Sequence, residues 1–236
     1  MKPWTLLDHT VTPDGKKITL HEHDGAYAIR VDGSPLMTTR QHASEERLAE
    51  LACAHVQSAA APRVLIGGLG FGFTLRAALG VLPAGAAVVV AEILAAVIEW
   101  NRNPAFPLAA DAIADQRVTI VERDVGAVIR ESRGAFDAIV LDVDNGPAAM
   151  STAANERLYD LAGLERTRRA LRPAGCAAFW SAAPAPDFAK LMARAGFRVE
   201  IQRSRARGNA GARHTIFLGW TTEEQNGPRM DTNKHE

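Results

Sequence analysis

Val64-Leu65-Ile66-Gly67-Gly68-Leu69-Gly70-Phe71-Gly72 is the stretch of this 236-residue sequence that decides its fold. A short apolar run leads into closely spaced glycines, and a helical pattern follows from Thr74. Glycines between a buried strand and a helix let the backbone turn tightly and approach a ligand where a side chain would clash. The stretch therefore predicts the first strand, turn and helix of a nucleoside-binding domain. Taken alone, it also fits an ordinary glycine-rich turn.

Short apolar runs alternate with helical patterns downstream of this turn. The apolar runs predict strands over residues 64–66, 87–91, 118–121, 138–141 and 177–180, and a closing hairpin over 198–204 and 213–220. Helices are predicted over residues 74–82, 94–101, 125–131, 154–171 and 187–195. Buried strands that alternate with helices are typical of a parallel sheet covered on both faces, so we expect an α/β fold.

The first 60 residues have a different pattern of apolar and polar residues. Over residues 16–41 apolar and polar residues alternate around Asp24-Gly25 and Asp32-Gly33, which are typical hairpin turns, so we expect a small antiparallel sheet. A helix is predicted over residues 44–57, with Ser44 as its cap. The expected units are an N-terminal region (1–60), a nucleoside-binding catalytic domain (61–221) and a polar, disordered tail (222–236).

Composition argues against several classes of function. The 27 basic residues balance 27 acidic ones, which does not favour a nucleic-acid binder, and no apolar stretch is long enough to cross a membrane. Cys53 and Cys176 are too few for a disulfide framework or a zinc site, and His21 and His23 lack a third metal ligand nearby. We therefore expect a cytoplasmic protein without a metal, whose partner is a small molecule.

Acidic residues follow three of the predicted strands, at the edge where open α/β sheets bind their ligands. Glu92 lies about twenty residues past the glycines, where a carboxylate can accept hydrogen bonds from both hydroxyls of a ribose. Asp124, with Val125 beside it, is placed to bind an adenine, and Asp142 ends the fourth strand. Helix capping would also explain Glu92 and Asp124, and NAD would fit the glycines and Glu92 equally well.

The order and spacing of these motifs resemble the spermidine synthase (polyamine aminopropyltransferase) family, a branch of the class I S-adenosylmethionine-dependent methyltransferase fold. The similarity runs from about Ile18 to Trp180. It is carried by Val31-Asp32-Gly33, the glycine turn through Arg76, Arg117-Val118 before Asp124, Phe136-Asp137-Ala138-Ile139-Val140-Leu141-Asp142, Gly146-Pro147-Ala148 and Leu171-Arg172-Pro173-Ala174-Gly175. The resemblance implies a Rossmann-like, mostly parallel seven-stranded sheet after a small antiparallel N-terminal sheet, and a homodimer formed through that N-terminal sheet.

The resemblance also implies a reaction, namely transfer of an alkyl group from a sulfonium nucleoside to a small amine. The co-substrate would be S-adenosylmethionine or decarboxylated S-adenosylmethionine. The residues implied to hold it are Gly68, Gly70, Phe71, Gly72, Glu92, Asp124, Val125 and Asp142. Asp142 and Asp144 would hold the amine and accept its proton, although residues 144–147 also fit an ordinary turn.

Three departures from the family leave the transferred group open. Phe71 stands where the family has an aspartate that contacts the aminopropyl end of the donor. Glu45-Glu46-Arg47 stands where the family has a tyrosine, a histidine and a glutamate, and the substrate loop is shortened to residues 142–147. Aminopropyl transfer and methyl transfer therefore both remain open, as does a nucleoside-binding protein without catalysis. An NAD-linked oxidoreductase fits the Asp142 strand end less well.

Overall fold

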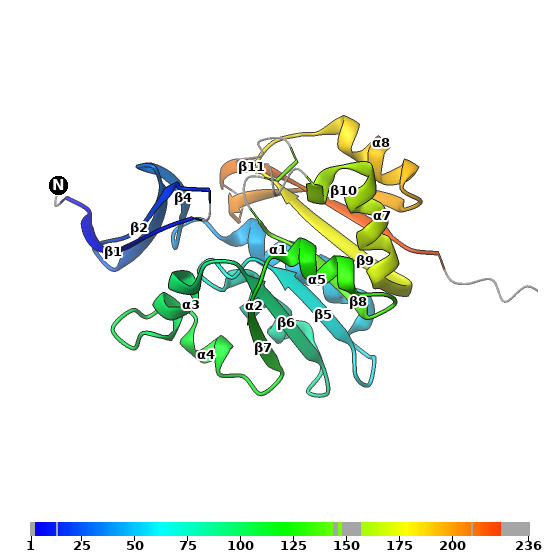
Figure 1. Cartoon of the computed structure of the whole chain (residues 1–236), viewed down its shortest axis with the longest axis horizontal. Helices are drawn as coiled ribbons and strands as arrows, with labels where there is room; N and C mark the ends of the chain where they lie inside the picture. Colours follow the sequence, from blue (N-terminus) through cyan, green and yellow to red (C-terminus); the bar gives the residue numbers. More distant parts are fainter. Residues whose placement is uncertain (1–2, 13, 144–145, 148–156, 209, 223–236) are drawn as a thin grey trace, which may run out of the picture.

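The computed structural model describes residues 3–12, 14–143, 146–147, 157–208 and 210–222. Its strands form a four-stranded sheet at the N-terminus and a seven-stranded sheet, and Figure 1 shows the small sheet at one end of the large one. No helix in these ranges is both long and apolar enough to cross a membrane. The tail predicted to be disordered lies almost wholly outside the described residues. The division into domains and the cytoplasmic location stay predictions.

The N-terminal sheet is an antiparallel meander of neighbouring strands, β1 (Thr5–Val11), β2 (Lys17–His23), β3 (Ala26–Val31) and β4 (Ser34–Thr38). Both predicted turns are present, and Asp24, Gly25, Asp32 and Gly33 all have positive φ, as type I′ hairpins require. The sequence did not predict β1, because most of its residues are exposed and show no clear alternation. The homodimer through this sheet stays a prediction.

The seven-stranded sheet has the order β10-β11-β9-β8-β5-β6-β7. Its strands are β5 (Arg63–Gly67), β6 (Ala87–Glu92), β7 (Val118–Glu122), β8 (Phe136–Leu141), β9 (Leu171–Ser181), β10 (Arg198–Arg207) and β11 (Ala210–Trp220). Strands β5 to β9 pair in parallel, and β11 pairs antiparallel with β9 and β10. The chain runs outward from β5 to β7 and returns to β8 on the other side of β5. Sheets of this kind bind ligands at such a reversal, beyond the carboxyl ends of the strands.

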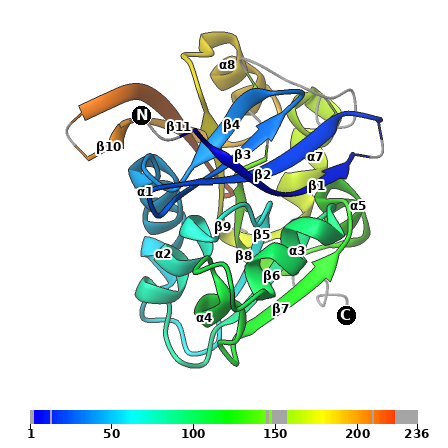
Figure 2. The ribbon, with the colours of Figure 1, turned by 90° about the vertical axis from the view of Figure 1, so that its left-hand side faces the viewer.

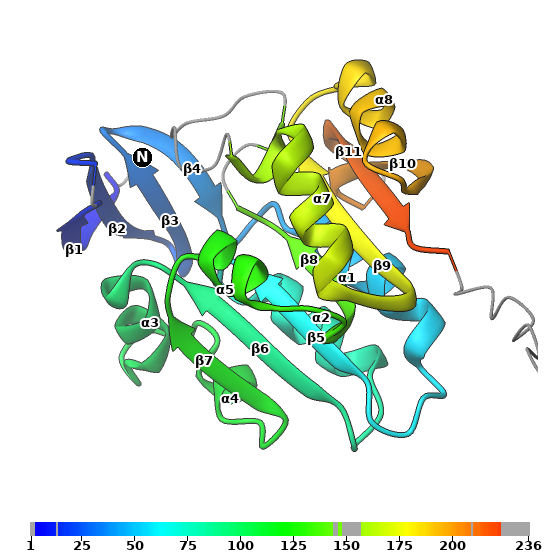
Figure 3. The same cartoon turned by 45° about the vertical axis from the view of Figure 1, so that its right-hand side comes forward.

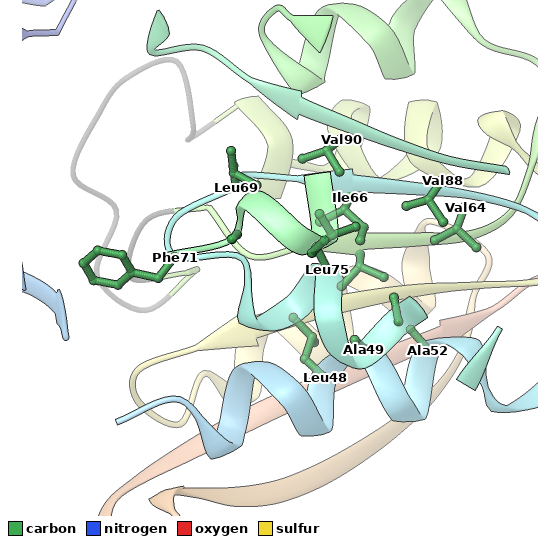
Figure 4. Close-up of a cluster of buried hydrophobic side chains, with 14 of the residues drawn as sticks. Leu48, Ala49, Ala52, Val64, Ile66, Leu69, Phe71, Leu75, Val88 and Val90 are labelled. Atoms are coloured by element: carbon green, nitrogen blue, oxygen red, sulfur yellow. The ribbon is translucent and has the colours of Figure 1, made fainter. Parts of the chain in front are cut away.

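Helices cover both faces of this sheet, as predicted. They are α1 (Ala43–Cys53) with the short η1 (Ala54–Val56), α2 (Phe73–Val81), α3 (Ala95–Arg102), α4 (Ala110–Ile113), α5 (Val125–Glu131), α7 (Leu161–Ala170) and α8 (Pro186–Arg194). Successive strand residues point to opposite faces. Val64 and Ile66 of β5 therefore pack with α1 and α2, as Figure 4 shows, whereas Leu65 joins the core that contains α5, α7 and α8. Figure 3 shows these last three helices together on one side of the sheet.

Two predicted helix boundaries were wrong. α1 begins after His42, without a side-chain cap, and Ser44 is buried within its first turn, where its hydroxyl contacts other elements. The helix predicted over residues 154–171 is interrupted at Asp160, which caps α7 by accepting a hydrogen bond from the Gly163 N–H (2.6 Å). Strand β9 then follows α7 directly at Leu171. The sequence did not predict α4, because four residues are too few to show a helical period.

Candidate active site

The glycine turn owes its shape to three glycines in left-handed backbone conformation. Gly68, Gly70 and Gly72 have φ values of +88°, +50° and +75°. The Gly68 N–H donates to the Ala91 carbonyl in β6 (2.9 Å), and a Cβ atom at position 68 would lie 2.6 Å from the carbonyl oxygen of Asp142. The turn is therefore wedged between the ends of β6 and β8, and only glycine fits there.

Glu92 ends β6 and binds the backbone of the glycine turn. Its Oε2 accepts a hydrogen bond from the Leu69 N–H (3.0 Å), and its Oε1 accepts one from the Leu94 N–H (2.9 Å). Burial raises the pKa of Glu92 above its ordinary value, and the backbone N–H groups act in the opposite direction. Helix α3 begins after Leu94 without a side-chain cap, so the capping alternative for Glu92 is not borne out. Glu92 also lines the cavity described below.

Asp124 follows β7 and caps α5. Its Oδ1 accepts a hydrogen bond from the Ala127 N–H (2.8 Å), so the capping alternative is confirmed. Asp124 also lines the same cavity as Glu92, beside the buried Val125. Capping engages one carboxylate oxygen, and Oδ2 makes no hydrogen bond with any residue of the described ranges. Capping and ligand binding are therefore compatible at this residue.

Asp142 follows β8, and its carboxylate lies deep in the molecule at the cavity. The Thr74 hydroxyl, at the start of α2, donates to Asp142 Oδ2 at 2.6 Å. Burial raises the pKa of Asp142 to about 6, although the Thr74 hydrogen bond acts against this rise. A carboxyl group with such a pKa is suited to accept a proton near neutral pH. Asp144, the second predicted catalytic residue, lies outside the described residues.

A cavity of about 290 Å³ joins these residues to the N-terminal sheet. This volume is close to the lower end of the range, about 300–1,000 Å³, that is typical of pockets for small ligands. Figure 2 shows β1 to β4 across the end of the larger sheet. The small sheet contributes an apolar wall that includes Ile18, Ile29, Val31, Leu36 and Met37. Within the described ranges, no three His, Cys, Asp or Glu side chains are grouped to hold a metal ion.

Phe71 and Gly72 are the described site candidates that do not line this cavity. The Phe71 side chain is only 1% exposed and meets Phe73 edge to face, with 6.5 Å between ring centroids. In Figure 4 its ring projects from the glycine turn away from the row of Val64, Ile66 and Leu75. Phe71 is thus a core residue in this arrangement. Gly72 serves as the N-cap of α2 in left-handed conformation.

Trp180, which ends the fifth predicted strand and is from its sequence position a candidate to border the site, lines the cavity, and the tertiary structure adds Glu45. Trp180 Nε1–H donates to Ser44 Oγ (3.1 Å), and Ser44 Oγ also lies 2.7 Å from His214 Nδ1. An indole N–H can only donate, so Ser44 Oγ accepts from Trp180. Burial lowers the pKa of His214 and favours its neutral form. This buried network fixes the start of α1, and with it Glu45, against β9 and β11.

Comparisons with known proteins agree on the fold. No protein-family model matches the sequence, and no curated protein matches it either. Spermidine synthase from Thermotoga maritima superposes with a TM-score of 0.73 at 19% identity, over 91% of this chain and 72% of that one. A spermidine synthase in complex with the transition state analogue AdoDATO gives 0.72 at 18% identity, over 91% and 72%. A probable spermidine synthase from Corynebacterium glutamicum gives 0.61 at 17% identity, over 93% and 81%.

This similarity covers both sheets and confirms the predicted architecture. The chain has a spermidine synthase-like fold, with a class I methyltransferase-like, mostly parallel sheet after a small antiparallel one. At 17–19% identity the likeness concerns the fold alone. The activity therefore has to be argued from the residues of the cavity.

Proposed function

We propose that this chain transfers an alkyl group from a sulfonium nucleoside to a small amine. The observation that carries the proposal is that Glu92, Asp124 and Asp142, from the ends of three strands, line one cavity beside the glycine turn. Agreement among several strand ends is more specific than the glycine turn alone. The spermidine synthase-like fold supports the same conclusion.

The residues present fit the nucleoside part of such a co-substrate. Glu92 lines the cavity with a carboxylate that can accept hydrogen bonds from ribose hydroxyls, and Asp124 Oδ2 is available to accept a hydrogen bond from an adenine amine. Leu94, Val97 and Val125 supply apolar surface in the same cavity for the faces of the base. The proposed binding set is Gly68, Gly70, Glu92, Asp124, Val125 and Asp142.

The protein contributes alignment and removal of a proton. A bound sulfonium nucleoside supplies an alkyl carbon whose bond to sulfur breaks, with the bonding electrons passing to sulfur. An ammonium cannot attack this carbon, so the acceptor first gives a proton to the Asp142 carboxylate. The freed nitrogen lone pair then forms the new bond to carbon, and the positive charge of the sulfonium passes to the product amine. A buried carboxylate with a pKa of about 6 is ionised at neutral pH and able to accept this proton.

An aminopropyl donor fits the charges of the cavity better than intact S-adenosylmethionine. Asp142 and Glu45 would repel the carboxylate of S-adenosylmethionine, which the decarboxylated donor lacks. Both basic residues at the cavity already have acidic partners. Lys16 lies 3.7 Å from Asp14, and Arg123 lies 2.7 Å from Glu131. We therefore place decarboxylated S-adenosylmethionine first and S-adenosylmethionine second.

Ligand-induced stabilisation tests this order. The melting temperature is measured with decarboxylated S-adenosylmethionine, S-adenosylmethionine, methylthioadenosine and NAD, and product masses are then determined with a panel of amines. A ligand at one hundred times its Kd adds about 2.7 kcal/mol, a shift of several degrees. We expect the decarboxylated donor to stabilise most and to yield an aminopropylated amine. A methylated product would show that S-adenosylmethionine is the donor. Stabilisation by NAD alone, or binding of the nucleosides without any turnover, would contradict the proposal.

A further inference from the structure

Glu45 is the acidic residue of α1 that the fold leaves without a partner. Glu46 contacts His42 Nδ1 (2.9 Å) and Glu50 contacts Arg47 (3.1 Å), and both lie on the outer surface of the helix. The Glu45 side chain is half-buried and lines the cavity, and its carboxylate makes no hydrogen bond or ion pair with any residue of the described ranges. A carboxylate that lines a largely apolar cavity without a partner loses part of its hydration, so this position points to a ligand that supplies the partner.

Asp142 lines the same cavity as Glu45. Burial raises the pKa of Glu45 well above its ordinary value, and the negative charge of Asp142 raises it further. The two carboxylates are therefore close enough to oppose each other's ionisation. Thr74 already occupies Asp142 Oδ2, which leaves Oδ1 and both oxygens of Glu45 for a ligand.

We propose that Glu45 and Asp142 together bind the reacting ammonium group of the acceptor, and that Glu45 makes the cavity select a cation over a neutral molecule of the same shape. This inference rests on the proposed function, because it assigns the acceptor end of that site. It concerns a residue of this chain that stands where the resembled family has a tyrosine.

The chemistry of the pair explains the selection. An ammonium donates three hydrogen bonds and carries a full positive charge, so it can contact both carboxylates and let both ionise. A hydroxyl donates one hydrogen bond and leaves the repulsion between the carboxylates in place. The hydrogen bonds of Ser44 with Trp180 and His214 hold the start of α1 in place, so Glu45 lines the cavity before any ligand arrives, which lowers the entropic cost of binding.

Calorimetry on the full chain tests the proposal. The protein is saturated with methylthioadenosine and titrated with 1,4-diaminobutane or with 1,4-butanediol, its neutral isostere. The variants are Glu45→Gln, which keeps the shape and removes the charge, and Glu50→Gln, which makes the same change on the outer surface of the same helix. We expect Glu45→Gln to weaken diamine binding about tenfold to a hundredfold and to leave diol binding within twofold. Glu50→Gln should leave both unchanged.

The nucleoside step separates this inference from the function on which it rests. Failure of the wild-type protein to bind methylthioadenosine would overturn the proposed function and this inference together. If the nucleoside binds but Glu45→Gln binds the diamine as tightly as the wild type, only the role of Glu45 is overturned. Equal weakening of diamine and diol would also overturn it, because shape rather than charge would then decide binding. Glu45→Ala, judged by the same ratio, replaces Glu45→Gln if that variant does not fold.

Discussion

The Thr74 hydroxyl donates a hydrogen bond to Asp142 Oδ2 across 2.6 Å and so joins the first turn of α2 to the end of β8. Thr74 lies two residues after Gly72, the last glycine of the turn, so one contact links the proposed nucleoside-binding turn to the proposed proton acceptor. The hydrogen bond opposes the rise in the pKa of Asp142 that burial causes. The sequence placed both residues at a strand or helix end, but only the fold brings them together.

Replacing Asp142 with asparagine should separate activity from binding. Asn keeps an oxygen that can accept from Thr74 but cannot take a proton, so we expect turnover with an amine to fall about a hundredfold or more. The melting-temperature shift caused by methylthioadenosine should remain. Turnover assays and melting curves check this, with Asp187→Asn as a control, because Asp187 is exposed and paired with Lys190. If Asp142→Asn turned over the amine at the wild-type rate, Asp142 would not be the base.

The pKa of Asp142 also predicts how stability depends on pH. The carboxyl group titrates near 3.8 in the unfolded chain and near 6 in the folded protein, so the folded state holds more protons between these values. The contribution of Asp142 to the free energy of unfolding of the wild type therefore falls as the pH rises from about 4 to 6, by on the order of 2–3 kcal/mol. Asp142→Asn should become more stable than the wild type above pH 6, measured by urea unfolding at a series of pH values. A difference that does not change with pH would contradict the assigned pKa.

The same pKa predicts a fall of kcat/KM on the acidic side. Below pH 6 the carboxyl group of Asp142 is protonated and cannot accept a proton, so kcat/KM should drop about tenfold per pH unit. Other charged groups that line the cavity can also change how kcat/KM depends on pH. They are Asp14, Lys16, Glu45, Glu92, Arg123 and Asp124. The hydrogen bond from Thr74 lowers the pKa of Asp142, so Thr74→Val, which removes that bond, should move the midpoint to higher pH. A midpoint that stays in place would show that Asp142 does not govern the profile.

Asp124 and Asp160 form a matched pair that separates capping from ligand binding. Both cap helices, Asp124 by accepting from Ala127 N–H (2.8 Å) and Asp160 from Gly163 N–H (2.6 Å), but only Asp124 lines the cavity. Each change to alanine should cost about 1 kcal/mol of stability. Only Asp124→Ala should also weaken methylthioadenosine binding, measured by calorimetry. Equal binding in the two variants would leave Asp124 with a capping role alone.

Gly68 and Gly15 form a second matched pair. Both have a φ of +88°, but a Cβ atom at Gly68 would lie 2.6 Å from the Asp142 carbonyl oxygen, whereas one at Gly15 would meet nothing within 4 Å. Gly15→Ala should cost about 1 kcal/mol through backbone strain alone. Gly68→Ala should cost several kcal/mol more and abolish nucleoside binding. Similar unfolding free energies for the two variants would refute the close packing of the turn against β8.

The sequence predicted much of the fold because the relevant signals are local. Strand residues such as Val64, Leu65 and Ile66 form an uninterrupted apolar run because the sheet is buried on both faces. The hairpin turns of the N-terminal sheet are indicated by Asp-Gly pairs. The outlying β1 lacks such a signal, since most of its side chains are exposed. The break at Asp160 was also missed, because a capping residue within a helical pattern is visible only when its hydrogen bond is seen.

The sequence by itself determined the parallel sheet, the glycine turn and the acidic strand ends, since each depends on the period and chemistry of neighbouring residues. Only the tertiary structure decided that Phe71 packs into the core, that Ser44 bonds with Trp180 and His214, and that Glu45 and Asp142 line one cavity. These outcomes depend on packing and loss of solvent between segments far apart in the chain, and no local pattern records them. In the sequence, Glu45 is an ordinary glutamate in the first turn of a helix. In the fold, it lines a cavity together with a second carboxylate, that of Asp142.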